Sequence, residues 1–277
     1  MPQQRGLALI AVLWLVAALS VIATGMMQTV RGEARMTART RDVVAASALG
    51  ESAMQIVLQA MVASGKRPDQ LVSDEVTYGG VPMRVQAMPL NGYIDINKAP
   101  LELLQQALQT AGGLDPARAA IIAQAIVEQR ATPGPSGKPG TFESPEDLLR
   151  IPGLDYPAYA GLARVVTTDA GGSGRVNPLA APAQVLRVLT SGNDAAVANF
   201  LVGRDAQQVG LDQSAMNSAW LDATGSSALE LTAWVPLADG GGVRVVRRYS
   251  LGKRDDGLPW RVFYAESFFD ASLPAVR

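Results

Sequence analysis

The residues that most often carry out catalysis are missing from this chain. It has 277 residues but no cysteine and no histidine, which excludes the usual zinc sites, cysteine nucleophiles and Ser-His-Asp triads. The one Ser-x-x-Lys spacing joins Ser250 to Lys253. We attribute this pair to chance, because it falls at the end of an expected strand, whereas serine–lysine enzymes place it at the start of a helix. The sequence therefore predicts a protein that is not an enzyme.

Carboxylates are the other side chains that could carry chemistry here, because their oxygens bind hard cations such as Ca²⁺. No EF-hand loop is present. Solvated surface charge is the simpler explanation for most of the acidic residues, so the sequence offers only weak candidates and leaves a metal site unknown. The aspartates that could gather around such an ion are Asp95, Asp169, Asp255, Asp256 and Asp270.

A short pattern of polar residues occurs twice. Residues 92–100 and 174–182 both run Gly, any residue, aliphatic, then Asp or Asn, and both end in Ala-Pro before an apolar segment. Asp95 and Asn177 hold the same place in the two copies. We interpret each copy as an extended segment that turns into a helix at Ala-Pro. A pair of polar ligands formed by Asp95 and Asn177 is the alternative.

One apolar run, Leu7–Val30, contains no charge and no proline. Its roughly 24 residues would form a helix about 36 Å long, enough to cross a bilayer core of about 30 Å. The run is longer than the apolar part of a secretory signal peptide, and no convincing small-residue cleavage site closes it. Two interpretations remain ahead: a plain signal anchor, and a pilin-like signal that a peptidase cuts between Gly6 and Leu7.

Helix is also expected beyond the apolar run, as far as Ser64. Residues 31–64 contain no proline, and Gly65 marks the end of the helix. An apolar stripe at spacings of three and four predicts that one face lies against a globular domain. The stripe consists of Val43, Ala46, Gly50, Met54, Val57 and Met61. Strands are expected at 76–90, 228–237, 243–251 and 260–269, the last three as an antiparallel meander.

The region between the two groups of strands has a helical character. Asp115-Pro116 and Ser144-Pro145 each place an N-cap residue before a proline at the first helical position, and Asp147 is spaced to complete a capping box. The expected fold class is α+β: a long N-terminal helix on a small antiparallel sheet, with a large all-α domain inserted between sheet segments. The aromatic residues expected to anchor the cores are Tyr93, Tyr156, Tyr159, Trp220, Trp234 and Trp260.

Residues 97–167 resemble tandem helix-hairpin-helix modules. In members of that family that bind DNA, a Gly-hydrophobic-Gly turn points backbone amides at a phosphate, and basic residues stand nearby. Here an aspartate replaces the second glycine of both hairpins, in the GLD sequences at 113–115 and 153–155. A carboxylate repels phosphate, so we expect the modules to serve as a structural or protein-binding scaffold, without nucleic acid.

Taken together, these features resemble the K-type minor pseudopilin of type II secretion systems (the GspK family), over almost the whole chain. The resemblance rests on RGLALIAVLWLVAALSVIA at the start, NGYIDINKAP, FESPEDLLRIPGLD and GRVNPLAAPAQVLRVL. It implies the following segments: a cleaved leader at 1–6, a transmembrane helix at 7–30, a pilin-like part at 31–95, an inserted helical domain at 96–215, and strands that complete the pilin-like part at 216–277.

By the family pattern, a prepilin peptidase cuts between Gly6 and Leu7, and Leu7 becomes the new, methylated N-terminus. The leader then lies in the cytoplasm and the body in the periplasm, held in the inner membrane by a single pass. Most pilin-like chains carry Glu at the fifth mature position. This chain has Ala11 there, as the K type is expected to show.

The resemblance further implies a non-enzymatic tip subunit that initiates or caps the pseudopilus. Its expected partners are the I- and J-type minor pseudopilins, with the H type as a further candidate, meeting the apolar stripe of the long helix and the sheet. No cofactor is required. Some family members bind Ca²⁺, but the resemblance assigns no ligands in this chain. The alternative function is a membrane-anchored helix-hairpin-helix receptor for DNA.

Overall fold

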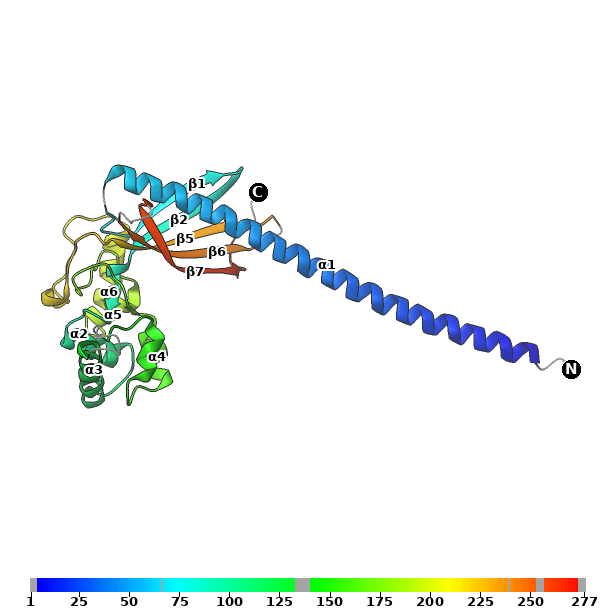
Figure 1. Ribbon diagram of the computed structural model, residues 1–277, viewed down its shortest axis with the longest axis horizontal. Helices are drawn as coiled ribbons and strands as arrows, with labels where there is room; N and C mark the ends of the chain where they lie inside the picture. Colours follow the sequence, from blue (N-terminus) through cyan, green and yellow to red (C-terminus); the bar gives the residue numbers. More distant parts are fainter. Residues whose placement is uncertain (1–3, 66, 133–139, 239, 253–256, 274–277) are drawn as a thin grey trace.

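The computed structural model describes residues 4–65, 67–132, 140–238, 240–252 and 257–273. It is an α+β protein built on one long helix, α1 (Gln4–Ser64), of 61 residues. At a rise of about 1.5 Å per residue, α1 is about 90 Å long. Its C-terminal half lies over a sheet, and its N-terminal half extends away from the rest of the chain (Figure 1). The helix ends where the sequence predicts, because Gly65 adopts a left-handed φ of 65°.

The main sheet has five strands, and every neighbouring pair is antiparallel. Its spatial order is β1-β2-β5-β6-β7. The last three strands form the expected meander, and the glycine-rich stretch before β6 is a hairpin turn. Apart from α1, all other described elements of the chain lie between β2 and β5, so the helical body is an insertion in the sheet. The five strands are β1 (Val72–Tyr78), β2 (Val81–Pro89), β5 (Ala228–Pro236), β6 (Gly242–Leu251) and β7 (Trp260–Asp270).

The predicted apolar stripe of α1 packs on one face of this sheet. Met54 and Leu58 are fully buried there against apolar side chains of β2, β5 and β6. Small residues let the helix approach closely: a Cβ atom on Gly50 would lie 2.9 Å from Cγ2 of Val245 in β6. The stripe is therefore covered by the sheet of the same chain, and a partner has to contact other surfaces.

The inserted helical body has a hydrophobic core of its own and hangs below the end of the sheet in Figure 1. Its first turn, η1 (Leu90–Gly92), is a 3₁₀ helix that leads out of β2. The expected start at Ser144-Pro145 forms a 3₁₀ helix, with the predicted capping box. The other elements are β3 (Ile94–Asp95), α2 (Leu101–Thr110), α3 (Pro116–Ala131), η2 (Pro145–Arg150), α4 (Tyr156–Leu162), β4 (Val166–Thr167), α5 (Ala183–Leu189), α6 (Asp194–Asp205) and η3 (Ser218–Trp220).

The aromatic residues do not all anchor a core as predicted. Tyr159 and Trp220 are buried in the helical body, and Tyr93 and Trp260 pack at the margins of the two cores. The prediction is wrong for Tyr156, which is 70% exposed. Tyr156 is the first residue of α4 and lies on the outer side of that helix. Trp234 lies on the sheet face opposite α1, half-buried under the guanidinium of Arg84.

One helix of the chain is long and apolar enough to span a membrane once. Among the residues with described side chains, the stretch that qualifies by length and composition is Met36–Ser64. Its apolar stripe is covered by the sheet, as expected for the core helix of a domain. The span expected at 7–30 is helical, but most of its side chains lie outside the described residues; those at 12–17, 19 and 20 are exposed.

The packing of α1 predicts which of its apolar residues support the fold. Met54→Ala removes a fully buried side chain and should lower the free energy of unfolding by about 2–5 kcal/mol. Ile56 lies on the other side of the same helix and is 42% exposed. Ile56→Ala should lower the free energy of unfolding by less than about 1 kcal/mol. Urea unfolding of the full chain in detergent measures both. Equal losses would contradict the packing described here.

Candidate functional site

The two copies of the polar sequence pattern begin two similar structural units. Each unit starts with an extended segment, continues through a helix, a turn and a second helix, and finally returns to run parallel beside its own start; in the first unit η2 and α4 come before the return, and in the second η3 does. In the first unit, β3 pairs in parallel with β4, Ile94 opposite Val166. In the second, Val176 forms a parallel bridge with Leu221. The sequence repeat therefore marks the start of a repeated fold, of which the sequence revealed only the first turn.

Asp95 and Asn177 make equivalent hydrogen bonds in the two units. Both are buried. Oδ1 of Asp95 accepts a hydrogen bond from the backbone N–H of Asn97 at 2.9 Å, and Oδ1 of Asn177 accepts one from Leu179 at 3.0 Å. The second oxygen or nitrogen of each side chain then ties down a distant segment. Oδ2 of Asp95 accepts from Ala170 at 3.2 Å, and Nδ2 of Asn177 donates to the carbonyl of Asp69.

A half-buried arginine completes each unit, and sequence analysis did not identify either one. Nη2 of Arg130, at the end of α3, donates to the carbonyl of Ala99 at 2.9 Å. Nη1 of Arg204, at the end of α6, donates to the carbonyl of Ala181 at 2.6 Å. Both alanines precede the proline that opens the unit's first helix. Burial lowers the pKa of both guanidinium groups. The signal that could have found them is an arginine near the end of the second helix in each unit.

The two units contact each other reciprocally through their glycines. A Cβ on Gly92 would lie 2.6 Å from the carbonyl carbon of Ala180, and a Cβ on Gly174 would lie 2.7 Å from that of Lys98. Ala180 and Lys98 hold the same position in the repeated pattern, one residue before the Ala-Pro alanine. The glycine of each unit thus packs on the turn of the other. The two contacts are therefore reciprocal.

These contacts favour a structural role for Asp95 and Asn177 over a paired ligand site. Their side-chain atoms are already bonded to the backbone, and burial raises the pKa of Asp95. Within the described part of the chain, no group of three or more acidic, His or Cys side chains is placed to hold a metal ion. Asp169 and Asp270 each accept a hydrogen bond from an amide two residues ahead. Asp255 and Asp256 lie outside the described residues.

The two GLD hairpins use their aspartates as helix caps. Oδ1 of Asp115 accepts from the backbone N–H groups of Ala117 and Arg118, both at 3.1 Å. Oδ1 of Asp155 accepts from Ala158 at 3.0 Å. The amides that would meet a phosphate are therefore satisfied by the chain's own carboxylates. Arg118 also bonds the second hairpin, through the carbonyl of Gly153 at 3.1 Å. This arrangement stabilises the modules and opposes nucleic-acid binding.

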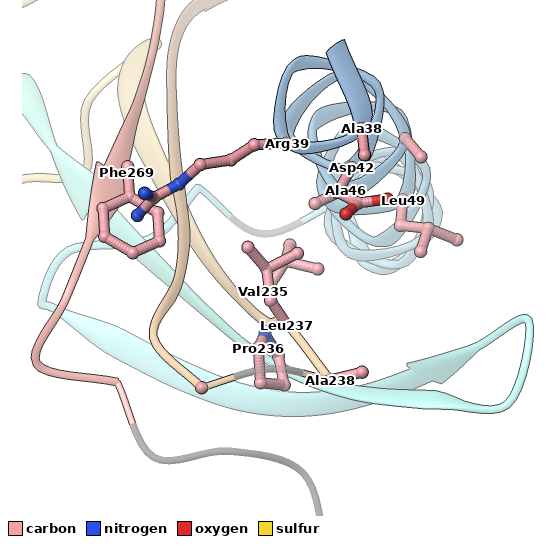
Figure 2. Close-up of a pocket in the computed structure, with 12 residues that line it drawn as sticks. Ala38, Arg39, Asp42, Ala46, Leu49, Val235, Pro236, Leu237, Ala238 and Phe269 are labelled. Atoms are coloured by element: carbon pink, nitrogen blue, oxygen red, sulfur yellow. The ribbon is translucent and has the colours of Figure 1, made fainter. Parts of the chain in front are cut away.

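A wedge-shaped cavity of about 800 Å³ lies where α1 diverges from the sheet. Its floor is apolar and includes Leu49 of α1 and Val235 of β5. Figure 2 shows Arg39 reaching from α1 toward the ring of Phe269 in β7, and its guanidinium carbon lies 4.4 Å from the ring centre. Asp42 lines the helix side of the wedge. No sequence pattern indicates this cavity, because it is formed by elements far apart in the chain.

The remaining predicted site residues have the following positions. Gly6, Leu7 and Ala11 are part of α1, but their side chains lie outside the described residues. Ser250 is near the end of β6, as expected, and Lys253 is not among the described residues.

No protein-family model matches this chain, and no curated protein shows significant sequence similarity to it.

The reciprocal glycine contacts make a direct prediction. Gly92→Ala and Gly174→Ala each force a methyl group into a backbone carbonyl, and each should lower the free energy of unfolding by about 2 kcal/mol or more. Gly172→Ala is the control from the same segment, because its Cβ would lie 3.4 Å from that of Asn91. We expect that variant to lose less than about 1 kcal/mol in urea unfolding. A tolerated Gly92→Ala would argue against the close contact.

The buried Asp95 predicts a pH dependence of stability. Its pKa is raised above the ordinary value near 3.8, so the folded protein binds this proton more tightly than the unfolded chain does. Its contribution to stability is therefore largest at acid pH and decreases as the pH rises through the window from about 3.8 to the raised pKa. The free energy of unfolding of the natural chain, measured relative to that of Asp95→Asn, should therefore fall as the pH rises through that window. Asp74→Asn, at an exposed aspartate of β1, is the control. If the effect of Asp95→Asn stayed constant with pH, the prediction would be contradicted.

Proposed function

We propose that this protein is a K-type minor pseudopilin of a type II secretion system, a non-enzymatic subunit at the tip of the pseudopilus. The observation that carries the proposal is α1 (Gln4–Ser64), a single helix of 61 residues. One half of it packs on an antiparallel sheet, and the other half extends away from the body (Figure 1). This arrangement supports a role as a subunit whose helix anchors it in a membrane or filament while its sheet domain stays outside.

The inserted helical body supports a place at the tip. It enters the chain between β2 and β5 and adds a bulky second core beside the sheet. Repeated subunits in a packed filament would have to accommodate that bulk at every step, whereas a terminal subunit does not. A place at the tip is also consistent with Ala11, which stands where most pilin-like chains carry Glu. A carboxylate in the membrane is costly unless it is paired, and a subunit with no neighbour above it has no amine to pair with.

The proposal assigns an orientation and a set of partners. The leader lies in the cytoplasm, α1 crosses the inner membrane once, and the sheet and helical body lie in the periplasm. The partners are other minor pseudopilins of the I and J types, and of the H type as a further candidate. Because the apolar stripe of α1 is buried against the sheet, these partners contact the free N-terminal half of α1 or the exposed parts of the sheet.

Processing of the N-terminus tests the proposal. Co-expression with a prepilin peptidase should remove residues 1–6 and add a methyl group at Leu7, and the intact mass of the membrane-extracted chain measures both. Gly6→Leu should leave the chain uncut and block its assembly with the partner pseudopilins. Gly32→Ala is the control, because it changes a glycine of the same helix away from the scissile bond. An unchanged mass with active peptidase, or normal assembly of the uncut chain, would count decisively against the proposal.

A further inference from the structure

A polar cavity of about 610 Å³ lies between the main sheet and the helical body. Strands β1 and β2 form its sheet side, and the end of α6 with the residues after it forms the opposite side. Nδ2 of Asn177 donates to the carbonyl of Asp69, which ties the segment before β1 to the helical body. The volume falls within the range of about 300–1,000 Å³ that is common for small-molecule sites.

Two arginines line the polar cavity, one from each side: Arg84 of β2 and Arg204 of α6. The guanidinium of Arg84 is held in place, because its Nε donates to Oγ of Ser73 at 3.0 Å and its plane lies over the ring of Trp234, 5.4 Å from the ring centre. Within the described residues, neither Nη atom of Arg84 has a hydrogen-bond partner. The sheet therefore presents a positioned cation with two donor groups unused.

The internal repeat shows that Arg204 also has a donor to spare. Its counterpart in the first unit, Arg130, uses both Nη atoms, which donate to the carbonyls of Ile96 at 3.0 Å and Ala99 at 2.9 Å. Nη1 of Arg204 makes the equivalent bond to Ala181. Its Nη2 has no hydrogen-bond partner among the described residues. The first arginine is thus fully occupied in closing its unit, whereas the second faces a cavity with one amino group unbonded.

The charge of Arg204 is only weakly balanced by the chain. Its side chain is 17% exposed, and the nearest carboxylate, that of Asp205, lies 3.9 Å from Nε and is itself 77% exposed. A carboxylate so far from the cation and so well solvated contributes little. With Arg84, Arg204 and Asp205 as its charged residues, the polar cavity has two positive charges and one negative. A single carboxylate bound there would neutralise it.

The neutral part of the lining consists mainly of side chains that both donate and accept hydrogen bonds. Within the described residues, their side-chain amides are not bonded to the protein. Gln207 follows the end of α6 with a left-handed φ of 51°, a position that glycine usually fills. A ligand with several hydroxyl groups matches such amides, because a hydroxyl group also donates and accepts. The three residues are Gln70, Gln86 and Gln207.

We propose that the polar cavity binds a small hydroxylated carboxylate, of the chemical class of the uronic and aldonic acids. The carboxylate lies between Arg84 and Arg204 and accepts hydrogen bonds from their free Nη groups, an arrangement that guanidinium geometry favours. The hydroxyl groups of the ligand bond the glutamine amides. The bound molecule then links the sheet to the helical body. This site goes beyond the proposed function and does not depend on it.

Calorimetric titration of the full chain in detergent tests the ligand class. D-glucuronate should bind at one site with a dissociation constant of about 1 mM or lower. Glucose lacks the carboxylate, and acetate and inorganic phosphate lack the ring hydroxyls, so each should bind about tenfold more weakly or worse. Absence of glucuronate binding would overturn the inference. Equal affinity for glucose would exclude recognition of the carboxylate, and equal affinity for acetate or phosphate would exclude recognition of the hydroxyls; either result overturns it as well.

Two arginines on the same face of the sheet provide matched variants. Arg84→Gln should weaken glucuronate binding about tenfold or more, because it removes a charge-assisted pair. Arg244 stacks on Phe268 at 4.0 Å in a similar way but does not line the polar cavity. Arg244→Gln should therefore change the dissociation constant by less than about threefold, since salt screens a distant charge. Equal losses would show a general effect of charge and would overturn the site.

The repeat supplies a second matched pair, one variant in each unit. Arg204→Gln and Arg130→Gln each remove an arginine that closes a unit, so both should lower the free energy of unfolding. Only Arg204→Gln should also abolish glucuronate binding, measured at a temperature at which both variants are folded. Loss of binding in both would assign the effect to the fold of the helical body and contradict the proposed contact. If Arg204→Gln does not fold, the comparison of Arg84→Gln with Arg244→Gln decides.

Discussion

Close approach between α1 and the sheet is achieved with small residues, and the core between them depends on it. Gly50 and Ala53 let the helix backbone lie against β5 and β6, and Met54 fills the space beside them. This contact fixes the position of the sheet on a helix that continues far beyond it. The same packing covers the apolar stripe of α1.

The helical body joins the sheet where three segments of chain cross. Nδ2 of Asn91 donates to the carbonyl of Thr224 at 2.7 Å, so the outgoing and returning segments are tied together. Oγ of Ser226 donates to the carbonyl of Ala170 at 2.6 Å. Because the insertion leaves and returns at adjacent points, it adds a second core without disturbing the register of β2 and β5. The reciprocal contacts of Gly92 and Gly174 then hold its two units together.

The aspartates of the hairpins show how one substitution redirects a module. A carboxylate at the first position before a helix accepts the free N–H groups of that helix, as Asp115 and Asp155 do. The chain therefore uses these hairpins for internal support, and Arg118 joins the two hairpins through the carbonyl of Gly153.

The sequence by itself determined the elements whose signals are local. Hydrophobic period, the caps at Asp115 and Ser144, and the glycine turns predicted α1, the sheet strands and the α+β class, because each depends on neighbours within a few residues. Only the tertiary structure decided the pairing of Arg130 with Ala99 and of Arg204 with Ala181, the exposure of Tyr156, and the wedge beside Phe269. These features arise where segments far apart in the chain meet, and no local pattern encodes which of them will touch.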